Sequence, residues 1–144
     1  MIMIEIETGN SVDVIDITDR IEQNLRESGV ENGICLVYSL HTTTGLTVNE
    51  ADTALINDIL NLLKKIAPKG AGYKHDQGDG NAHAHLQATV LGNSVIIPVE
   101  RSRLVLGTWQ RILFFELDGP RRRSIVVRII SNSQEKVDHN GTVA

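Results

Sequence analysis

In several short segments of this 144-residue chain, apolar residues recur at every second position. This alternation limits the possible fold more than any other feature of the sequence. A period of two is typical of β-strands with one buried face. Strands are expected over 2–7, 12–15, 33–40, 94–99, 104–106, 107–118 and 124–130. Helices are expected from Thr18 to Gly29, from about 52 to 67 and from 82 to 91, where helical apolar spacing or helix-end residues occur.

The order of these segments favours an α+β domain, because strands and helices alternate too rarely for a doubly wound parallel sheet. We predict antiparallel strands curled into a barrel-like or sandwich sheet, with the helices packed on one side. Residues 1–132 are expected to form this single domain. The polar residues 133–144 are expected to be a loosely ordered tail, in which His139 has no role. Thr18 and Asn81 are expected to cap the helices that follow them.

Charge, hydropathy and cysteine content limit the partners and the cellular location that we expect for this chain. The net charge is −4, so we expect no nucleic acid as a partner. Neither a membrane-spanning run nor a signal peptide is expected, because the long apolar stretch and the basic start are missing.

The single cysteine, Cys35, lies in an apolar run and is expected to be buried. One cysteine cannot form an internal disulfide, which fits a reducing cytoplasm.

The stretch from His75 to His85 holds three of the five histidines and two aspartates. Imidazole and carboxylate groups are the ligands that zinc, manganese and similar ions take in proteins. The stretch therefore predicts a metal site, and the alternative is a polar surface loop with solvated histidines. On a helix, His83 and His85 point about two hundred degrees apart. We expect His85 to face inward as a ligand and His83 to face solvent.

A second segment that is a candidate for the functional site begins at His41, directly after the apolar strand that ends near Leu40. A histidine at a strand end is held by the sheet and still faces open space. The alternative is a histidine that is hydrogen-bonded at the edge of the sheet. The threonines that follow can orient an imidazole or bind an anion through their hydroxyls, and Asn49 and Glu50 lead into the next helix.

Trp109 and the arginines are candidates for substrate binding. Trp109 is the only tryptophan, and it is either a core plug or a platform on which a ring stacks. The chain concentrates its basic residues at Arg101, Arg103, Arg111 and 121–123. These are either solvated hairpin ends or a phosphate site, because the guanidinium fork matches phosphate oxygens.

Together these segments resemble the YjbQ-like family, also called the secondary thiamine-phosphate synthase family. The resemblance covers residues 1–131 in the same order. It rests on His41-Thr-Thr-Thr-Gly-Leu-Thr-Val-Asn49-Glu50, His75-Asp76, His85-Leu86 with Leu91-Gly92, and Gly107-Thr108-Trp109-Gln110. It implies a small α+β fold with a barrel-like sheet, a homotrimer, and a metal-binding histidine cluster near a subunit interface. It also implies weak synthesis of thiamine phosphate from a hydroxymethylpyrimidine pyrophosphate and a thiazole phosphate.

The resemblance also implies a ligand set. The histidines that match the family's motifs are His41, His75 and His85, for a divalent metal ion such as zinc, manganese or magnesium. His83 falls where the motif does not require histidine. Gln87 stands where the family often has lysine, which removes a candidate phosphate-binding charge.

Roles for the remaining residues follow from their chemistry. Glu50 and Asp76 are the candidate catalytic groups, as proton acceptors or as partners that hold a histidine tautomer. The candidate binding residues for a phosphate-bearing small molecule are Thr42, Asn49, Thr108, Trp109, Gln110 and Arg121. Two alternatives to the synthase stay open. One is a metal-dependent hydrolase of a small phosphate ester, and the other is a metal- or ligand-binding module without turnover.

Overall fold

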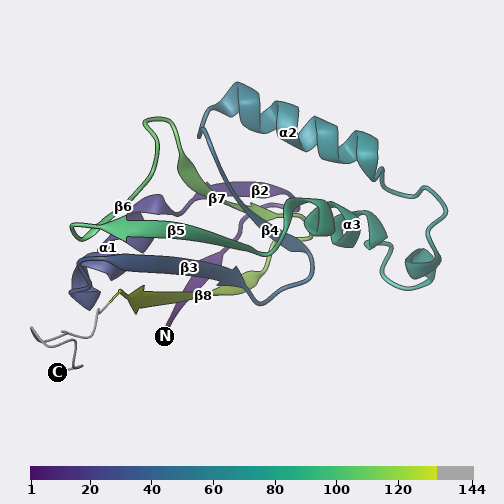
Figure 1. The fold of residues 1–144 in the computed structure, drawn as a ribbon. Helices are drawn as coiled ribbons and strands as arrows, with labels where there is room; N and C mark the ends of the chain where they lie inside the picture. The colour runs from purple at the N-terminus through teal and green to yellow at the C-terminus, as the bar shows by residue number, and fades with distance from the viewer. Residues whose placement is uncertain (133–144) are drawn as a thin grey trace, which may run out of the picture.

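Two antiparallel sheets and three α-helices make up the computed structural model, which describes residues 1–132 (Figure 1). The expected tail at 133–144, with His139, lies outside the described residues. The larger sheet has the strand order β1-β8-β3-β5-β6, and its strands are β1 (Ile2–Glu7), β8 (Arg122–Ser131), β3 (Gly33–Ser39), β5 (Ser94–Glu100) and β6 (Arg103–Leu104). The smaller sheet has the order β2-β7-β4, with β2 (Asp13–Asp16), β7 (Arg111–Glu116) and β4 (Thr44–Asn49). The prediction of an α+β domain with antiparallel strands is confirmed.

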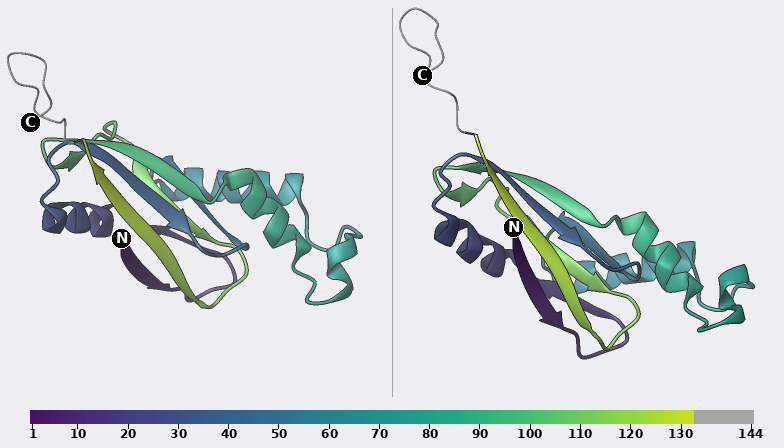
Figure 2. Two further views of the ribbon diagram at one scale, coloured as in Figure 1. Left: turned by 60° about the horizontal axis from the view of Figure 1, so that its bottom comes forward. Right: turned by 90° about the horizontal axis from the view of Figure 1, so that it is seen from below.

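The helices occupy two places in this arrangement. They are α1 (Thr18–Ser28), α2 (Thr53–Ile66) and α3 (Ala82–Leu91), with a short 3-10 helix η1 (Lys74–Gln77) before α3. In α1, Ile21 and Leu25 are buried in the core between the two sheets. The other two α-helices cover the outer face of the smaller sheet (Figures 1 and 2). Among residues 1–132 no helix combines the length and the apolar character needed to cross a membrane.

The central strand of the smaller sheet, β7, is buried on both faces, as its unbroken apolar run requires. Ile112 and Phe114 face the larger sheet, while Leu113 and Phe115 face α2 and α3. In the larger sheet, Cys35 lies in the inter-sheet core, as expected. Burial raises the pKa of the Cys35 thiol to about 11, so this thiol stays protonated and unreactive.

Helix capping differs from the prediction at Thr18 and Asn81. At α1, Oδ1 of Asp16 accepts hydrogen bonds from the Thr18 N–H at 3.0 Å and from its hydroxyl at 2.7 Å. At α3, Oδ1 of Asp76 accepts a hydrogen bond from the Ala82 N–H at 3.0 Å. In each case an upstream aspartate provides the oxygen that caps the helix, because a carboxylate is a stronger acceptor for these N–H groups than a neutral side chain.

The segment Gly107–Gln110 forms a turn, although the sequence predicted that it would begin a strand. The Gln110 N–H donates to the Gly107 carbonyl at 3.1 Å, and the Gly107 N–H donates to Oε1 of Gln110 at 2.8 Å. Trp109 is 71% exposed in this turn, so its interpretation as a core plug is wrong. The strand β7 begins one residue after the turn.

Candidate functional site

His41 lies just beyond the end of β3 and bonds to the neighbouring strand β8. Its Nε2 accepts a hydrogen bond from the Ser124 N–H at 2.8 Å. A neutral imidazole that accepts at Nε2 carries its proton on Nδ1. Burial lowers the pKa of His41, the positive charge of Arg123 lowers it further, and Glu116 opposes the shift. The neutral ring, with a proton at Nδ1, is therefore favoured at this position.

Beneath His41 lies a buried ion pair between Glu116 and Arg123, which are 0% and 4% exposed. Arg123 donates to both oxygens of Glu116, and its Nη2 also donates to the Thr43 hydroxyl at 2.8 Å. The Thr8 hydroxyl donates to Oε1 of Glu116 at 2.7 Å. These bonds fix the loop after β3 against β7 and β8, and the loop carries His41 with it.

His75 and His85 contact each other through their rings. The ring centroids are 4.8 Å apart and the planes meet at 78°. His75 lies in η1 and His85 in α3, and the bond from the Ala82 N–H to Asp76 joins these two elements. Asp76 therefore holds the helix of one histidine against the turn of the other, which is a positioning role.

One cavity of about 320 Å³ brings His41 and His85 together. Thr42 and Arg121, both predicted for substrate binding, line the same cavity. Arg121 is oriented by Asp118, whose carboxylate accepts from its Nη2 at 3.0 Å and whose carbonyl accepts from its Nε at 2.8 Å. The cavity thus combines two imidazoles with an anion-binding guanidinium.

His75 lies on the far side of His85, in a neighbouring hollow that Tyr73 and Leu86 also line. Within residues 1–132, no three His, Cys, Asp or Glu side chains form a group placed to hold a metal ion. The donor chemistry still fits a divalent ion at the pair of rings from His75 and His85. The set of three histidine ligands stays a prediction.

The other predicted residues lie elsewhere in the protomer. Asn49, Glu50 and residues 108–110 do not line the hollows formed by His41, His75 and His85 in the described chain. The strand β4 separates the two groups, because His41 lies before its start and Glu50 follows its end. Six strand residues span on the order of 16 Å.

Asp118, which the sequence did not single out, also lines the cavity of His41 and His85. Two further lining residues are Asn81, which was expected only as a helix cap, and Arg123, which belongs to the basic run 121–123. The amide of Asn81 donates to Oδ2 of Asp118 at 3.0 Å. The strand β7 ends at Glu116 and Asp118 follows two residues later, so a polar residue shortly after a buried strand was the available signal. Gln87 lies outside this cavity, where its amide donates to the Ala67 carbonyl at 3.1 Å and ties α3 to the end of α2.

The family model described as UPF0047 protein YjbQ-like matches residues 2–132. The chain belongs to the YjbQ-like family. A YjbQ-like relative, the UPF0047 protein of Archaeoglobus fulgidus, is 51% identical over 125 residues, which cover 87% of this chain and 97% of that protein. The UPF0047 protein YugU of Bacillus subtilis is 37% identical over 131 residues, covering 88% and 96%.

Solved YjbQ-like structures share the fold. A YbjQ-like protein of unknown function from Sulfolobus solfataricus superposes with a TM-score of 0.87 at 43% identity, covering 90% of this chain and 95% of that one. An uncharacterized conserved protein of the yjbq/upf0047 family from Clostridium acetobutylicum gives 0.85 at 45% identity, covering 90% and 100%. These relatives establish family and fold, and their names assign no reaction.

Proposed function

We propose that this YjbQ-like chain is a divalent-metal-dependent enzyme that acts on a phosphate-bearing small molecule. The observation that supports the proposal best is the cavity in which His41, His85 and Arg121 converge, with His75 in ring contact with His85. The ion would be held by His75 and His85, with His41 as the third ligand. His41 joins them by giving up the hydrogen bond from the Ser124 N–H to its Nε2.

The reaction we propose is the weak thiamine-phosphate synthesis that the family resemblance implies. A bound divalent ion would neutralise charge on the departing pyrophosphate. Arg121 binds phosphate oxygens through the guanidinium that Asp118 orients. Thr42 lines the cavity and offers a hydroxyl to the same oxygens.

Arg121→Ala should lower kcat/KM about tenfold to a hundredfold, because a hydrogen bond to a charged group contributes about 1.5–3 kcal/mol. The assay supplies metal-reloaded protein with hydroxymethylpyrimidine pyrophosphate and thiazole phosphate, and measures thiamine phosphate and released phosphate. Arg122→Ala is the matched control, because Arg122 is the next residue and bonds to Glu7 on β1.

Each result of this assay has one meaning. A coupled product that falls in Arg121→Ala supports the synthase. Phosphate release from a small phosphate ester, without coupling, supports the hydrolase instead. A shift of the unfolding temperature without any product supports a binding module. Equal activity of both arginine variants and the parent would remove Arg121 from the site.

We also propose that the chain forms a homotrimer through the outer face of the larger sheet. Ile34, Tyr38, Ile96 and Ile130 are exposed on the strands of this sheet, with Ile96 at 64%. A contiguous exposed apolar face of a soluble protein marks an interaction site. Leu40 is also exposed and lines the His41 cavity, so the interface would reach the proposed site. We also propose a cytoplasmic location, because the single cysteine of the chain cannot form an internal disulfide.

Light scattering should give a mass about three times the 15.8 kDa of one chain. Ile96→Glu should dissociate the assembly, because it places a charge in the apolar face. Leu62→Glu is the control, since Leu62 is 56% exposed on α2, away from the larger sheet. A parent protein of single-chain mass at micromolar concentration would refute the proposal, and dissociation by Leu62→Glu alone would move the interface to α2.

A further inference from the structure

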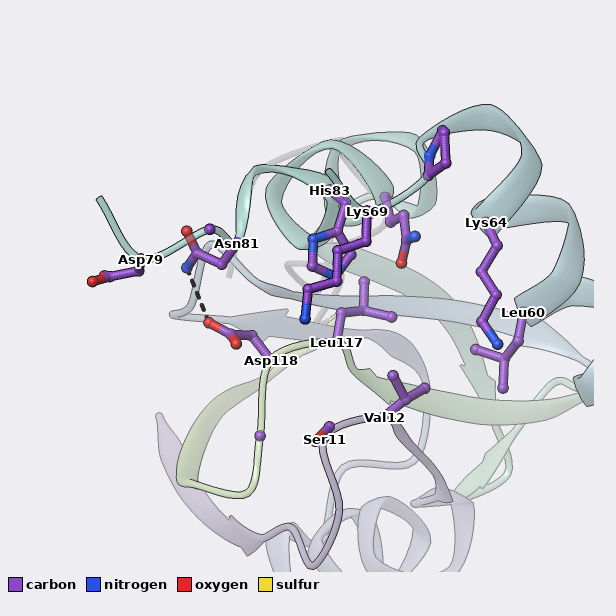
Figure 3. Close-up of a pocket in the computed structure, with 14 residues that line it drawn as sticks. Ser11, Val12, Leu60, Lys64, Lys69, Asp79, Asn81, His83, Leu117 and Asp118 are labelled. Carbon is purple, nitrogen blue, oxygen red and sulfur yellow. Dashed lines mark hydrogen bonds between the residues drawn. The ribbon is translucent and has the colours of Figure 1, made fainter. Parts of the chain in front are cut away.

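A second cavity, of about 450 Å³, lies between the end of α2, the start of α3 and the loop after β7 (Figure 3). Its volume lies in the range of small-molecule sites. Its polar lining includes Lys64, Lys69, Asn81 and His83. It shares Asp79, Asn81 and Asp118 with the cavity of His41 and His85. The two cavities have no histidine in common, because His83 lines only this second cavity.

Two buried polar atoms in this cavity lack a hydrogen-bond partner within residues 1–132. They are Nδ1 of His83 and Oδ1 of Asn81. Buried polar atoms in folded proteins are nearly always paired, so an unpaired couple at one cavity indicates a bound molecule or water. Solvent was the expected environment of His83, and the burial of its Nδ1 shows that this expectation was wrong for that atom.

The charges at this cavity favour an anion. The amines of Lys64 and Lys69 extend to it, and neither forms an ion pair with a described residue (Figure 3). The carboxylate of Asp118 is already paired with Arg121 at 3.0 Å. Asp79 points away from the other labelled side chains (Figure 3). The two lysines and the imidazole of His83 therefore line the cavity without a described carboxylate partner.

The cavity also has an apolar lining, which comes from Val12, Leu60 and Leu117. We propose that this cavity binds a small organic anion, with its phosphate or carboxylate group at Lys64, Lys69 and His83 and an apolar portion on these three residues. The residues proposed to contact this anion are not used by the proposed metal chemistry. The proposal therefore stands or falls independently of that function.

Phenyl phosphate is the probe, because it carries both parts of the proposed ligand. Chelator-treated protein is titrated by calorimetry, and the ring nitrogens of the histidines are followed by NMR. Saturable binding that shifts the His83 resonances is expected, tighter than binding of inorganic phosphate. Benzyl alcohol, which lacks the charge, should give no saturable binding. Benzoate in place of phenyl phosphate separates a carboxylate from a phosphate ligand.

Lys69→Ala and His83→Ala should each weaken phenyl phosphate binding about tenfold, the usual loss for a hydrogen bond to a charged group. Lys65→Ala is the matched control, because Lys65 follows Lys64 on α2 and does not line the cavity. His85→Ala should retain binding, which distinguishes this site from the proposed metal site. The proposal is overturned if no saturable binding occurs, if Lys69→Ala and His83→Ala bind like the parent, or if His41 and His85 shift in place of His83.

Discussion

Replacing Glu116 with glutamine should destabilise the folded chain by about 3–5 kcal/mol, the usual cost of removing one partner of a buried ion pair. The guanidinium of Arg123 would then keep its charge at 4% exposure without a counter-charge. Denaturant unfolding at one fixed protein concentration measures the loss. Glu7→Gln is the control, because Glu7 pairs with Arg122 on the surface at 3.1 Å, and its change should stay within about 0.5 kcal/mol.

A double variant shows whether the loss of stability comes from losing the ion pair or from leaving one charge buried without a partner. Glu116→Met with Arg123→Met should recover much of the loss, since well-packed apolar residues replace buried pairs at little cost. If Glu116→Gln alone changes the free energy of unfolding no more than Glu7→Gln does, the pair is not a structural support of the His41 loop.

The same carboxylate should make stability depend on acid pH. Burial raises the pKa of Glu116, but hydrogen bonds from Arg123 and Thr8 outweigh it and hold the pKa below its ordinary value of 4.5. The unfolded chain therefore binds the proton first as the pH falls. The stabilisation by Glu116 is complete above about pH 4.5 and is lost as the pH drops through the folded pKa. Glu116→Gln should make the free energy of unfolding depend less on pH in this acid range. Part of the dependence should remain because of Asp16. Burial raises the pKa of Asp16, but its hydrogen bonds with Arg111 and Thr18 lower it overall.

The sequence predicted the strands well because alternation reports burial of one face directly. It left open whether they form a barrel or a sandwich, and it did not predict which strands pair. The strand β2 follows β1 in the chain but pairs with β7. Pairing across such distances depends on tertiary packing, which leaves no periodic signal in a short segment. The run from Ile112 to Phe115 did contain a signal, because both faces of a strand without polar residues must be covered.

The candidate site was predicted in part for a similar reason. Strand ends and helix starts placed His41 and His85 at one cavity, as their positions in the sequence allowed. Trp109 and Glu50 were assigned to the same site from the chemistry of their side chains, and β4 separates them from the histidines within one protomer. The Oδ1 of Asp76 caps α3, a contact that the sequence did not predict, and its catalytic role stays a prediction. A sequence gives the residue type at a loop position, and the geometry of the loop decides which hydrogen bond that residue makes.

His85→Ala should abolish stoichiometric metal binding and leave the fold intact. Two remaining imidazoles bind a divalent ion weakly, because a protein site for such an ion usually needs at least three ligands. The helix α3 packs through Ala84 and Ala88, which are 0% and 7% exposed, so the fold does not depend on the ring of His85. Metal content per chain after chelation and reloading gives the first readout, and thermal unfolding of the chelated protein gives the second.

His83→Ala is the matched control, because His83 is two residues away on the same helix and lines the other cavity. It should retain metal while its phenyl phosphate binding weakens about tenfold. If both variants bind metal like the parent, the stretch from His75 to His85 is not a metal site, and the interpretation as a polar loop holds. If His85→Ala unfolds the chain, the ion stabilises the fold. The proposal of an open catalytic position would then be wrong, since the coordination of a structural ion is filled by protein ligands.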